Sequence, residues 1–497
     1  MNLLFDALFR AAPEGSAIEA PGRRLTYGEL HEETGRWAAA LAALGVRPGD
    51  RVAVQVEKSL ENLILYLACV RAGAVFLPLN TGYTLAELAY FIGDAEPALI
   101  VCDPAAEAGV RQLAGKARVV TLSASGEGSM AQCVAAAAGS LAPVARSADD
   151  LAAICYTSGT TGRSKGAMLT HRALEANART LTTLWRFTAD DVLIHALPTY
   201  HVHGLFVATH VAMLAGASMI LQPKFDPAQV IAAMPRATAL MGVPTHYTRL
   251  LADPGLNREA TAGMRLFVSG SAPLLAQTHQ DFAARTGHRI LERYGMTETG
   301  MNASNPYRGE RRAGTVGFPL PDVELRIVDE TSGRALQAGE IGGIEVRGPN
   351  VCAGYWRNEE KTSESFRENG FFITGDLGVV DDEGYLTIVG REKDLIITGG
   401  LNVYPKEVEA EIDAIPGVIE SAVIGVPHPD FGEQVVAVVA IGVTGETRLT
   451  EADILDALAR RLARFKQPKR VVFVADLPRN PMGKVVKAEL RNSVPPP

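Results

Sequence analysis

Short apolar runs alternate with longer amphipathic stretches along most of this chain. The runs have the length of buried strands, whereas the stretches between them repeat apolar residues at helical spacing. Such alternation predicts βαβ units and largely parallel sheets. Strands are expected at 51–55, 98–101, 151–156, 217–221 and 265–268, and helices at 26–44, 60–72 and 168–184.

The pattern changes at about Gly314, after which short strands and glycine turns at 324–328 and 343–348 indicate a small antiparallel, barrel-like unit. After about residue 390, helical patterns at 406–415 and 451–464 flank a strand at 420–427. The predicted fold class is therefore α/β. A large N-terminal domain, 1–390, holds two mostly parallel α/β sheets and the β-barrel-like unit, and a smaller, mobile α+β lid occupies 391–497.

Composition and charge narrow the classes of protein that fit this pattern. The 497 residues are 47% hydrophobic and 21% charged, as in a globular enzyme with a large core. The net charge of −8 argues against a nucleic-acid or anionic-membrane partner. The five cysteines lack metal-ligand spacing, and no membrane-length apolar run or signal peptide is visible, so we expect a cytoplasmic protein. The sequence leaves the oligomeric state open.

The segment 156–166, with the sequence YTSGTTGRSKG, is the most specific chemical signal in the chain. Its glycines let backbone N–H groups converge on an anion, and its hydroxyls and Lys165 add further donors. An apolar run precedes it and a helical pattern follows, so a phosphate loop between a strand and a helix is expected. The spacing of Gly162 and Lys165 departs from the Walker A pattern, which excludes a P-loop kinase or GTPase.

Six further motifs follow this loop in order along the chain. They are SGSAP at 269–273, ERYGMTET at 292–299, TGDLG at 374–378, GREKD at 390–394, GGLNVYP at 399–405 and PRNPMGK at 478–484. Together with the loop, this set resembles the adenylate-forming family, which includes acyl-CoA synthetases, luciferases and the adenylation domains of peptide synthetases. The resemblance covers essentially the whole chain.

The resemblance implies that ATP, Mg²⁺ and coenzyme A bind to this chain. Glu298, with Thr157, is matched to the Mg²⁺ site, because hard cations prefer oxygen ligands. Asp376 is matched to the ribose hydroxyls, with Arg391 assisting. The full set of ATP-binding residues implied is Thr157, Ser158, Gly159, Thr160, Thr161, Gly162, Lys165, Ser271, Ala272, Pro273, Glu292, Arg293, Tyr294, Gly295, Met296, Thr297, Asp376, Arg391 and Lys484.

By the same resemblance, the chain catalyses two half-reactions. Lys484 bridges the attacking carboxylate and the α-phosphate in the first, and it is expected to be catalytic together with Glu298 and His203. For the second, the lid rotates about Lys393 and brings Gly399 and Gly400 to a pantetheine tunnel, where a side chain would obstruct CoA. No carrier module with a phosphopantetheine serine follows, so free CoA is the expected acceptor.

The choice of acid depends on polar residues in a pocket that should otherwise be apolar. An arginine beside the tail of a monocarboxylate would be a buried charge without a partner, whereas a dicarboxylate supplies one. The substrate-binding set is His203, Arg249, Ser271, Arg293 and Met301, and it resembles the malonyl-CoA synthetase subgroup. The function expected is ATP-dependent conversion of malonate and CoA to malonyl-CoA through malonyl-adenylate, with release of AMP and pyrophosphate.

Several alternatives stay open at this point. Each arginine could pair internally with an acid such as Glu292. His203 could simply cap or pack a helix, and Met301 could fill the core. Val202 stands where some members of the subgroup carry threonine, so methylmalonate is an alternative substrate, as are other short-chain or aryl acids. A non-catalytic adenylate sensor is a further alternative, although such a binder has no need of Lys484.

Overall fold

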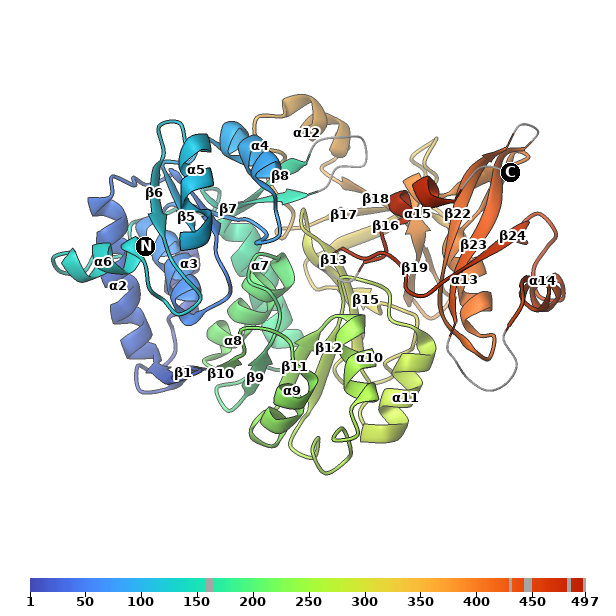
Figure 1. Cartoon of the computed structure of the whole chain (residues 1–497), viewed down its shortest axis with the longest axis horizontal. Helices are drawn as coiled ribbons and strands as arrows, with labels where there is room; N and C mark the ends of the chain where they lie inside the picture. Colours follow the sequence, from blue (N-terminus) through green and yellow to red (C-terminus); the bar gives the residue numbers. More distant parts are fainter. Residues whose placement is uncertain (158–163, 429–430, 442–448, 481–483, 495–497) are drawn as a thin grey trace. The chain divides into compact units, whose positions relative to one another are not determined.

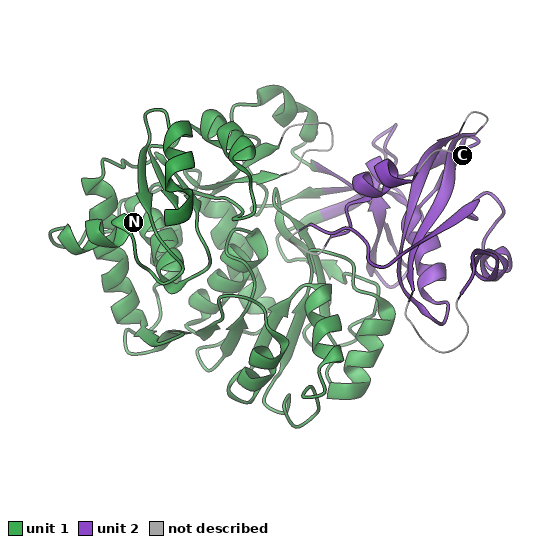
Figure 2. Ribbon diagram, in the orientation of Figure 1, with its two compact units in different colours: residues 1–324, 346–372 green, residues 325–345, 373–497 purple. Residues whose placement is uncertain are grey.

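The computed structural model describes residues 1–157, 164–428, 431–441, 449–480 and 484–494. The chain divides into two compact units, one of residues 1–324 and 346–372 and the other of residues 325–345 and 373–497 (Figure 2). The boundary proposed for the mobile lid, between residues 390 and 391, stays a prediction, because compactness does not report on mobility.

A nine-stranded sheet forms the centre of the first unit, in the order β15-β14-β13-β12-β11-β9-β10-β1-β2 (Figure 1). The six strands β13, β12, β11, β9, β10 and β1 run parallel to one another. The outer strands β2, β14 and β15 pair antiparallel. The strands are β1 Ser16–Ala20, β2 Arg23–Thr26, β9 Val192–His195, β10 Ser218–Leu221, β11 Ala239–Gly242, β12 Leu266–Ser269, β13 Leu291–Met296, β14 Gly300–Ser304 and β15 Phe318–Pro319.

A six-stranded sheet, in the order β6-β5-β3-β4-β7-β8, is the second layer of this unit. Its pairs are parallel except β7 with β8. The strands are β3 Arg51–Gln55, β4 Val75–Pro78, β5 Leu99–Cys102, β6 Arg118–Thr121, β7 Leu151–Thr157 and β8 Lys165–Thr170. Nearly every position of β4 and β5 is buried, as expected for strands covered on both faces.

Helices cover both sheets. On one side of β11 and β12, the apolar faces of α9, α10 and α11 pack on the sheet (Figure 1). Between the sheets, Tyr66 of α3 contacts Phe76 of β4 and stacks on His210 of α8. The helices are α1 Leu3–Leu8, α2 Tyr27–Ala43, α3 Leu60–Ala72, α4 Leu85–Ala95, α5 Glu107–Leu113, α6 Ser129–Ala136, α7 His171–Leu184, α8 Thr209–Ala215, α9 Pro227–Ala233, α10 Pro244–Ala252, α11 Ala276–Thr286 and α12 Glu359–Ser365.

The expectation that the phosphate loop joins a strand to a helix is wrong. The chain on both sides of the loop forms an antiparallel pair, with Thr157 opposite Lys165, and α7 begins only at His171. The pairing extends from Thr157 and Lys165 to Leu151 and Thr170, so the segment before α7 is a strand. The predicted helix, which began at residue 168, therefore included the last residues of this strand.

The second unit contains most of a four-stranded sheet, β16-β17-β18-β19, and a five-stranded sheet in which β24 and β22 pair with β23. Residues of β23 alternate between two cores, one shared with α13 and α14 and the other with α15. The elements are β16 Glu324–Val328, β17 Gly342–Arg347, β18 Phe372–Val380, β19 Leu386–Arg391, β20 Ile396–Thr398, β21 Leu401–Val403, α13 Pro405–Asp413, β22 Val418–His428, β23 Gly432–Ile441, α14 Glu451–Ala459, β24 Arg470–Val474 and α15 Lys487–Ser493.

These units confirm the predicted fold class, with parallel α/β sheets in the larger N-terminal part and an α+β arrangement near the C-terminus. The unit expected to resemble a barrel is the four-stranded sheet, whose strand order is linear. Within the described parts of the chain, no helix is both long enough and apolar enough to cross a lipid bilayer.

One partly buried ion pair joins three elements of the first unit. Arg265, at the start of β12, donates to both carboxylate oxygens of Asp191 at 2.7 Å and to the backbone oxygens of Trp185 and Arg186. The Asp191 side chain is 5% exposed, whereas that of Arg265 is 24% exposed. The pair therefore fixes the end of α7 against the entries of β9 and β12.

We expect Arg265→Met to lower the free energy of unfolding by about 3 kcal/mol, because it leaves the Asp191 carboxylate nearly buried and unpaired. The matched control is Arg236→Met, which removes an arginine that binds both oxygens of Glu19 at the surface, and it should cost less than about 1 kcal/mol. Denaturant titration of the two variants measures the difference. Equal losses would show that burial of Asp191 does not set the strength of the pair.

Candidate active site

Four neighbouring parallel strands end at the same edge of the nine-stranded sheet. These strands are β13, β12, β11 and β9, and in open parallel sheets ligands bind at the carboxyl ends of the strands. Arg293 lies within β13, Ser269 ends β12, and His195 ends β9. The topology thus brings together segments that are far apart in the sequence, and two of the predicted substrate-binding residues, Arg293 and Ser271, come from them.

His203 is the first residue of a π-helical turn, His203–Ala208, that follows β9. Its side chain is fully buried, Nδ1 lies 3.4 Å from the Ser271 hydroxyl, and Nε2 has no hydrogen-bond partner. Burial, and then the charge of Arg293, hold the pKa of His203 well below its usual value. The imidazole is therefore neutral at physiological pH and can donate one proton and accept another.

Arg293 is a buried cation without an anion. Its side chain is 4% exposed, Nε and Nη2 make no hydrogen bond, and the ion pairs among the described residues include none to it. Burial lowers the pKa of Arg293 to about 9, which leaves the guanidinium charged at neutral pH. Gly270 makes room for this group, because a Cβ atom there would lie 2.3 Å from Cζ of Arg293.

The alternative in which Arg293 pairs with Glu292 does not occur. Successive residues of a strand face opposite sides, so the two side chains diverge. The Glu292 carboxylate accepts from Gly314 N at 3.2 Å, and it lies 3.5 Å from Nδ1 of His279, an ion-pair distance without hydrogen-bond geometry.

Two residues that the sequence analysis missed extend the cluster. Nδ1 of His246 and Oγ of Ser269 are buried without a hydrogen-bond partner, like Nε2 of His203 and the guanidinium of Arg293. Burial lowers the pKa of His246 to about 3, and its ring stacks on Phe225 at 3.7 Å. Buried polar atoms almost always have partners, so this concentration of unpaired atoms indicates a place for a polar ligand. In the sequence, the position of His246 near the start of α10 was a signal that could have pointed to this site.

Arg249 differs from Arg293, and the expectation that it would be buried is wrong. It lies on α10, where His246, Tyr247 and Leu250 face the interior and Arg249 is exposed. The helical period turns it away from its buried neighbours. Its role as a substrate ligand stays a prediction.

The remaining substrate candidates line the same region. Ser271 adopts a left-handed backbone conformation with φ of 70°, which is uncommon for a residue other than glycine and often marks a functional site. Met301 is buried, and its backbone forms two hydrogen bonds with the Asn177 side chain, at 2.9 and 3.0 Å. Gly295 permits the close approach of β13 to β14, because a Cβ atom there would lie 2.1 Å from Gly300 O.

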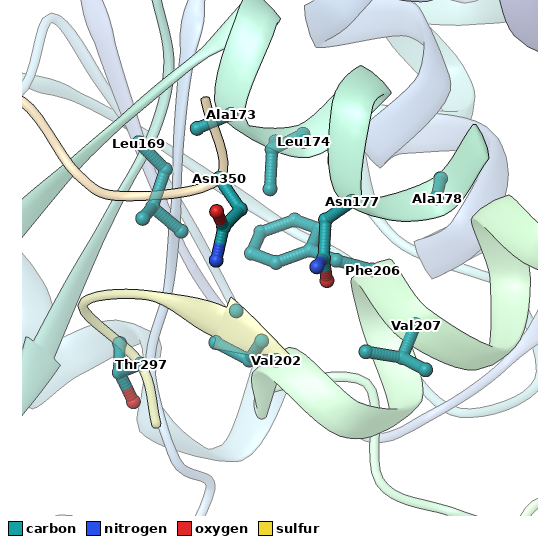
Figure 3. Close-up of a pocket in the computed structure, with 11 residues that line it drawn as sticks. Leu169, Ala173, Leu174, Asn177, Ala178, Val202, Phe206, Val207, Thr297 and Asn350 are labelled. Carbon is teal, nitrogen blue, oxygen red and sulfur yellow. The ribbon is translucent and has the colours of Figure 1, made fainter. Parts of the chain in front are cut away.

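A small cavity adjoins the segment that carries His203. Its volume is about 10 Å³, the space of roughly one water molecule, and Figure 3 shows the Asn350 side chain beside it among apolar side chains. Oδ1 of Asn350 is buried without a hydrogen-bond partner. The lining residues are Leu169, Ala173, Leu174, Asn177, Ala178, Val202, Phe206, Val207, Thr297, Gly300 and Asn350.

The predicted metal ligands lie together at the phosphate-loop hairpin. The Thr157 hydroxyl donates to Glu298 Oε1 at 3.2 Å, and the Tyr355 hydroxyl donates to the same oxygen at 3.1 Å. Among the described residues, no group of three or more His, Cys, Asp or Glu side chains could hold a metal. A carboxylate and a hydroxyl fit Mg²⁺, which usually takes only one or two protein carboxylates and completes its shell with water and phosphate.

Lys165 begins β8, with Nζ 5.8 Å from the centre of the Tyr355 ring. Partial burial, and then the charge of Lys361, lower its pKa. The other predicted residues of the loop, Ser158, Gly159, Thr160, Thr161 and Gly162, lie outside the described residues. The remaining predicted nucleotide-binding residues lie in or just after β12 and β13. Ala272 and Pro273 follow β12, Tyr294 and Met296 lie in β13, and Thr297 follows β13.

The second unit carries the other predicted residues. Asp376 on β18 is 4% exposed and pairs with Arg391 of β19 at 2.9 Å, so the structure brings these two together. Lys393 is exposed in a short 3₁₀ turn after β19. Lys484 is exposed, and its backbone exchanges hydrogen bonds with Asn480, at 3.0 Å to the side chain and 2.9 Å to the backbone N–H.

Gly399 and Gly400 form the turn between β20 and β21, with φ of 58° and 78°. Within this unit a Cβ atom on Gly400 would meet nothing within 4 Å. The backbone conformation alone therefore accounts for glycine here, and the requirement for a narrow tunnel stays a prediction.

Residues 5–356 match the family of AMP-binding enzymes, and residues 407–484 match the C-terminal domain of AMP-binding enzymes. The chain therefore belongs to the AMP-binding enzyme family, and the predicted resemblance is confirmed. Among solved structures it is similar to ATP-bound MatB from Rhodopseudomonas palustris, with 58% identity and a TM-score of 0.97 over 99% of this chain and 98% of that one.

Two further relatives are similar along nearly the whole chain. The feruloyl-CoA synthase of Amycolatopsis sp is 37% identical, over 97% of this chain and 96% of the relative. The malonate–CoA ligase of Arabidopsis thaliana is 32% identical, over 99% of this chain and 88% of the relative.

We expect Asp376→Ala to lower kcat/KM for ATP on the order of a hundredfold or more, because two charge-assisted hydrogen bonds to the ribose would be lost. Steady-state kinetics at a saturating concentration of the acid measures it. Asp382→Ala, which removes an exposed acid from the same unit, is the control. A kcat/KM for ATP within about twofold of the parent enzyme would remove Asp376 from the nucleotide site.

Proposed function

We propose that this chain is an ATP-dependent malonate–CoA ligase. A carboxylate oxygen of malonate attacks the α-phosphorus of ATP, which releases pyrophosphate and leaves malonyl-adenylate. The sulfur of CoA, after loss of its proton, then attacks the acyl carbon, which releases AMP and leaves malonyl-CoA. The malonate–CoA ligase of Arabidopsis thaliana, similar over 99% of this chain, supports the choice of acid.

The observation that carries this proposal is the buried guanidinium of Arg293, which has no anionic partner among the described residues. A charge in that position is costly unless a ligand neutralises it. The distal carboxylate of a dicarboxylic acid neutralises it and fits the planar donors of arginine. A monocarboxylate leaves the guanidinium desolvated and unpaired. The neutral His203 and the Ser271 hydroxyl offer further hydrogen bonds beside it.

Val202 lines the small cavity next to the segment that carries His203 (Figure 3). The choice among short acids does not follow from this cavity, so methylmalonate, other short-chain acids and aryl acids stay alternative substrates.

The phosphate-loop hairpin supplies the charge stabilisation that adenylation needs, because two anions must approach each other. Lys165 serves the triphosphate as a point charge, and Thr157 and Glu298 are the residues that would hold Mg²⁺. When bound, Mg²⁺ offsets negative charge on the phosphate oxygens. Glu298 is kept in place by the hydroxyl groups of Thr157 and Tyr355.

The second unit contributes groups to each half-reaction in this proposal. Asp376 receives the ribose hydroxyls, with its carboxylate oriented by Arg391, and Lys484 bridges the attacking carboxylate and the α-phosphate. A rotation about Lys393 then replaces Lys484 with the turn of Gly399 and Gly400, which admits CoA. A non-catalytic adenylate sensor is the alternative of a different class, and such a protein has no use for Lys484.

We also propose that the reaction takes place in the cytoplasm, where the five free cysteines would stay reduced. The absence of nucleic-acid and membrane partners stays a prediction from the net charge of −8.

Arg293→Met should reduce kcat/KM for malonate roughly thirty- to several-thousandfold, because the distal carboxylate would lose its buried partner. Butyrate lacks that carboxylate and should lose much less. The measurement is the ratio of kcat/KM for malonate to that for butyrate, and Arg258→Met, which removes an exposed arginine outside the predicted site, is the matched control. If the ratio is unchanged while both rates fall, Arg293 has a structural role and the malonate proposal loses its main support.

Lys484→Ala should block formation of the adenylate far more than formation of the thioester. The physical reason is that this lysine serves only the step in which the carboxylate meets the α-phosphate. Malonate-dependent exchange of pyrophosphate into ATP reports the first step, and synthetic malonyl-AMP with CoA reports the second. Lys116→Ala, an exposed lysine of the first unit, is the control. Equal loss in both assays would contradict the proposed rotation.

A further inference from the structure

A second buried cation lies at the same edge of the nine-stranded sheet. Lys58 lies between β3 and α3, is 6% exposed, and has no ion pair among the described residues. Its ammonium group donates to the His195 backbone oxygen at 2.7 Å and lies 2.9 Å from Nδ1 of the same residue. A buried ammonium with only neutral partners is costly, and burial lowers the pKa of Lys58 well below its usual value. A bound anion nearby would favour the charged form of Lys58.

The two neighbours of the His195 ring determine which of its nitrogens carries the proton. The Gly204 carbonyl oxygen can only accept, so the proton lies on Nε2 and Nδ1 accepts from the Lys58 amino group. Nε2 in turn lies 2.9 Å from Gly204 O, to which it then donates. Burial, and then the charge of Lys58, hold the pKa of His195 well below its usual value, so the ring stays neutral.

The hydrogen bond to Gly204 fixes the segment that carries His203. The Thr209 hydroxyl donates to the same oxygen at 3.1 Å. On the opposite side the chain packs tightly, because a Cβ atom on Gly204 would lie 2.1 Å from Pro198 O. The π-helical turn that begins at His203 is thus held from two sides, and turns of this kind are frequent at functional sites.

The charge of Lys58 also reaches the unpaired polar cluster. Burial lowers the pKa of His246, and the charges of Arg249 and then of Lys58 add to this effect, as burial and then the charge of Arg293 lower the pKa of His203. Two buried cations therefore act on the same group of neutral histidines. In a buried region such charges are poorly screened, so both add to the positive potential felt by a bound acid.

We propose that Lys58, acting through His195, is a positioning and specificity residue for the acid site. It holds the turn that presents His203, and its charge favours an acid with two negative charges over an acid with one. This inference rests on the proposed malonate–CoA ligase function and adds a residue that has no direct contact with the acid in that proposal.

The test compares Lys58→Met with the parent enzyme for malonate and butyrate. Met keeps the length of the side chain and removes its charge and donors. We expect kcat/KM for malonate to fall about ten- to a hundredfold, mostly through KM, and that for butyrate to change less than about threefold. His210→Gln is the matched control, because His210 is also buried but hydrogen-bonds Tyr66, at 2.6 Å. It should leave the ratio of the two kcat/KM values unchanged.

A second pair of variants keeps the inference testable if Lys58→Met does not fold. In His195→Gln the amide nitrogen occupies the place of Nε2 and keeps the bond to Gly204, whereas in His195→Asn the amide oxygen replaces only Nδ1. Asn should therefore lower kcat/KM for malonate at least about fivefold more than Gln. Equal effects of the two variants would overturn the positioning role.

The outcomes for the two proposals are distinguishable. A parent enzyme that does not prefer malonate over butyrate contradicts the proposed function itself. A parent enzyme that prefers malonate, with the same preference in Lys58→Met, contradicts only the inference about Lys58. A parallel fall for both acids shows that Lys58 has a structural role alone.

Discussion

The positive charge of Arg293, buried without an anion among the described residues, is the constraint around which the proposed acid site is arranged. A guanidinium that is 4% exposed has lost most of its hydration, and among the described residues it makes no ion pair to recover that loss. The protein tolerates this cost at the edge of the sheet where ligands bind in parallel α/β folds. The surrounding groups, neutral histidines and a serine hydroxyl, can each bond to a carboxylate without competing for the charge.

The parallel sheet makes such an arrangement possible. Successive strands that run in the same direction deliver their carboxyl ends to one edge, so residues from β9, β11, β12 and β13 meet there. Two glycines then allow close approach, since Gly270 accommodates the guanidinium of Arg293 and Gly204 lies against the backbone of Pro198. Neither position has room for a side chain without a shift of its neighbours.

Adenylation and thioester formation make opposite demands on the groups around the acyl carbon. The first step needs positive charge beside two anions, and the second needs an open path for a thiol. The motifs of this chain divide between two compact units, so each unit can serve a different demand. In the proposed mechanism the substrate acid and the metal are bound by residues of the first unit. Asp376 and Arg391 belong to the second unit and pair with each other there.

The sequence by itself determined the family and the fold class, because the family's residues lie in contiguous motifs such as 156–166, 292–299 and 478–484. The roles of the residues in those motifs stay predictions. The sequence could not tell that Arg293 is buried and Arg249 is exposed. That difference depends on which face of α10 turns outward and on the burial of β13. The sequence also assigned the end of β8, from Met168 to Thr170, to a helix, because a short apolar segment fits both periods until its pairing partner is known. Lys58 and His195 are 137 residues apart, and neither lies in a motif. Their contact was decided by the tertiary structure alone, because the cost of burying a charge depends on what surrounds it in space rather than along the chain.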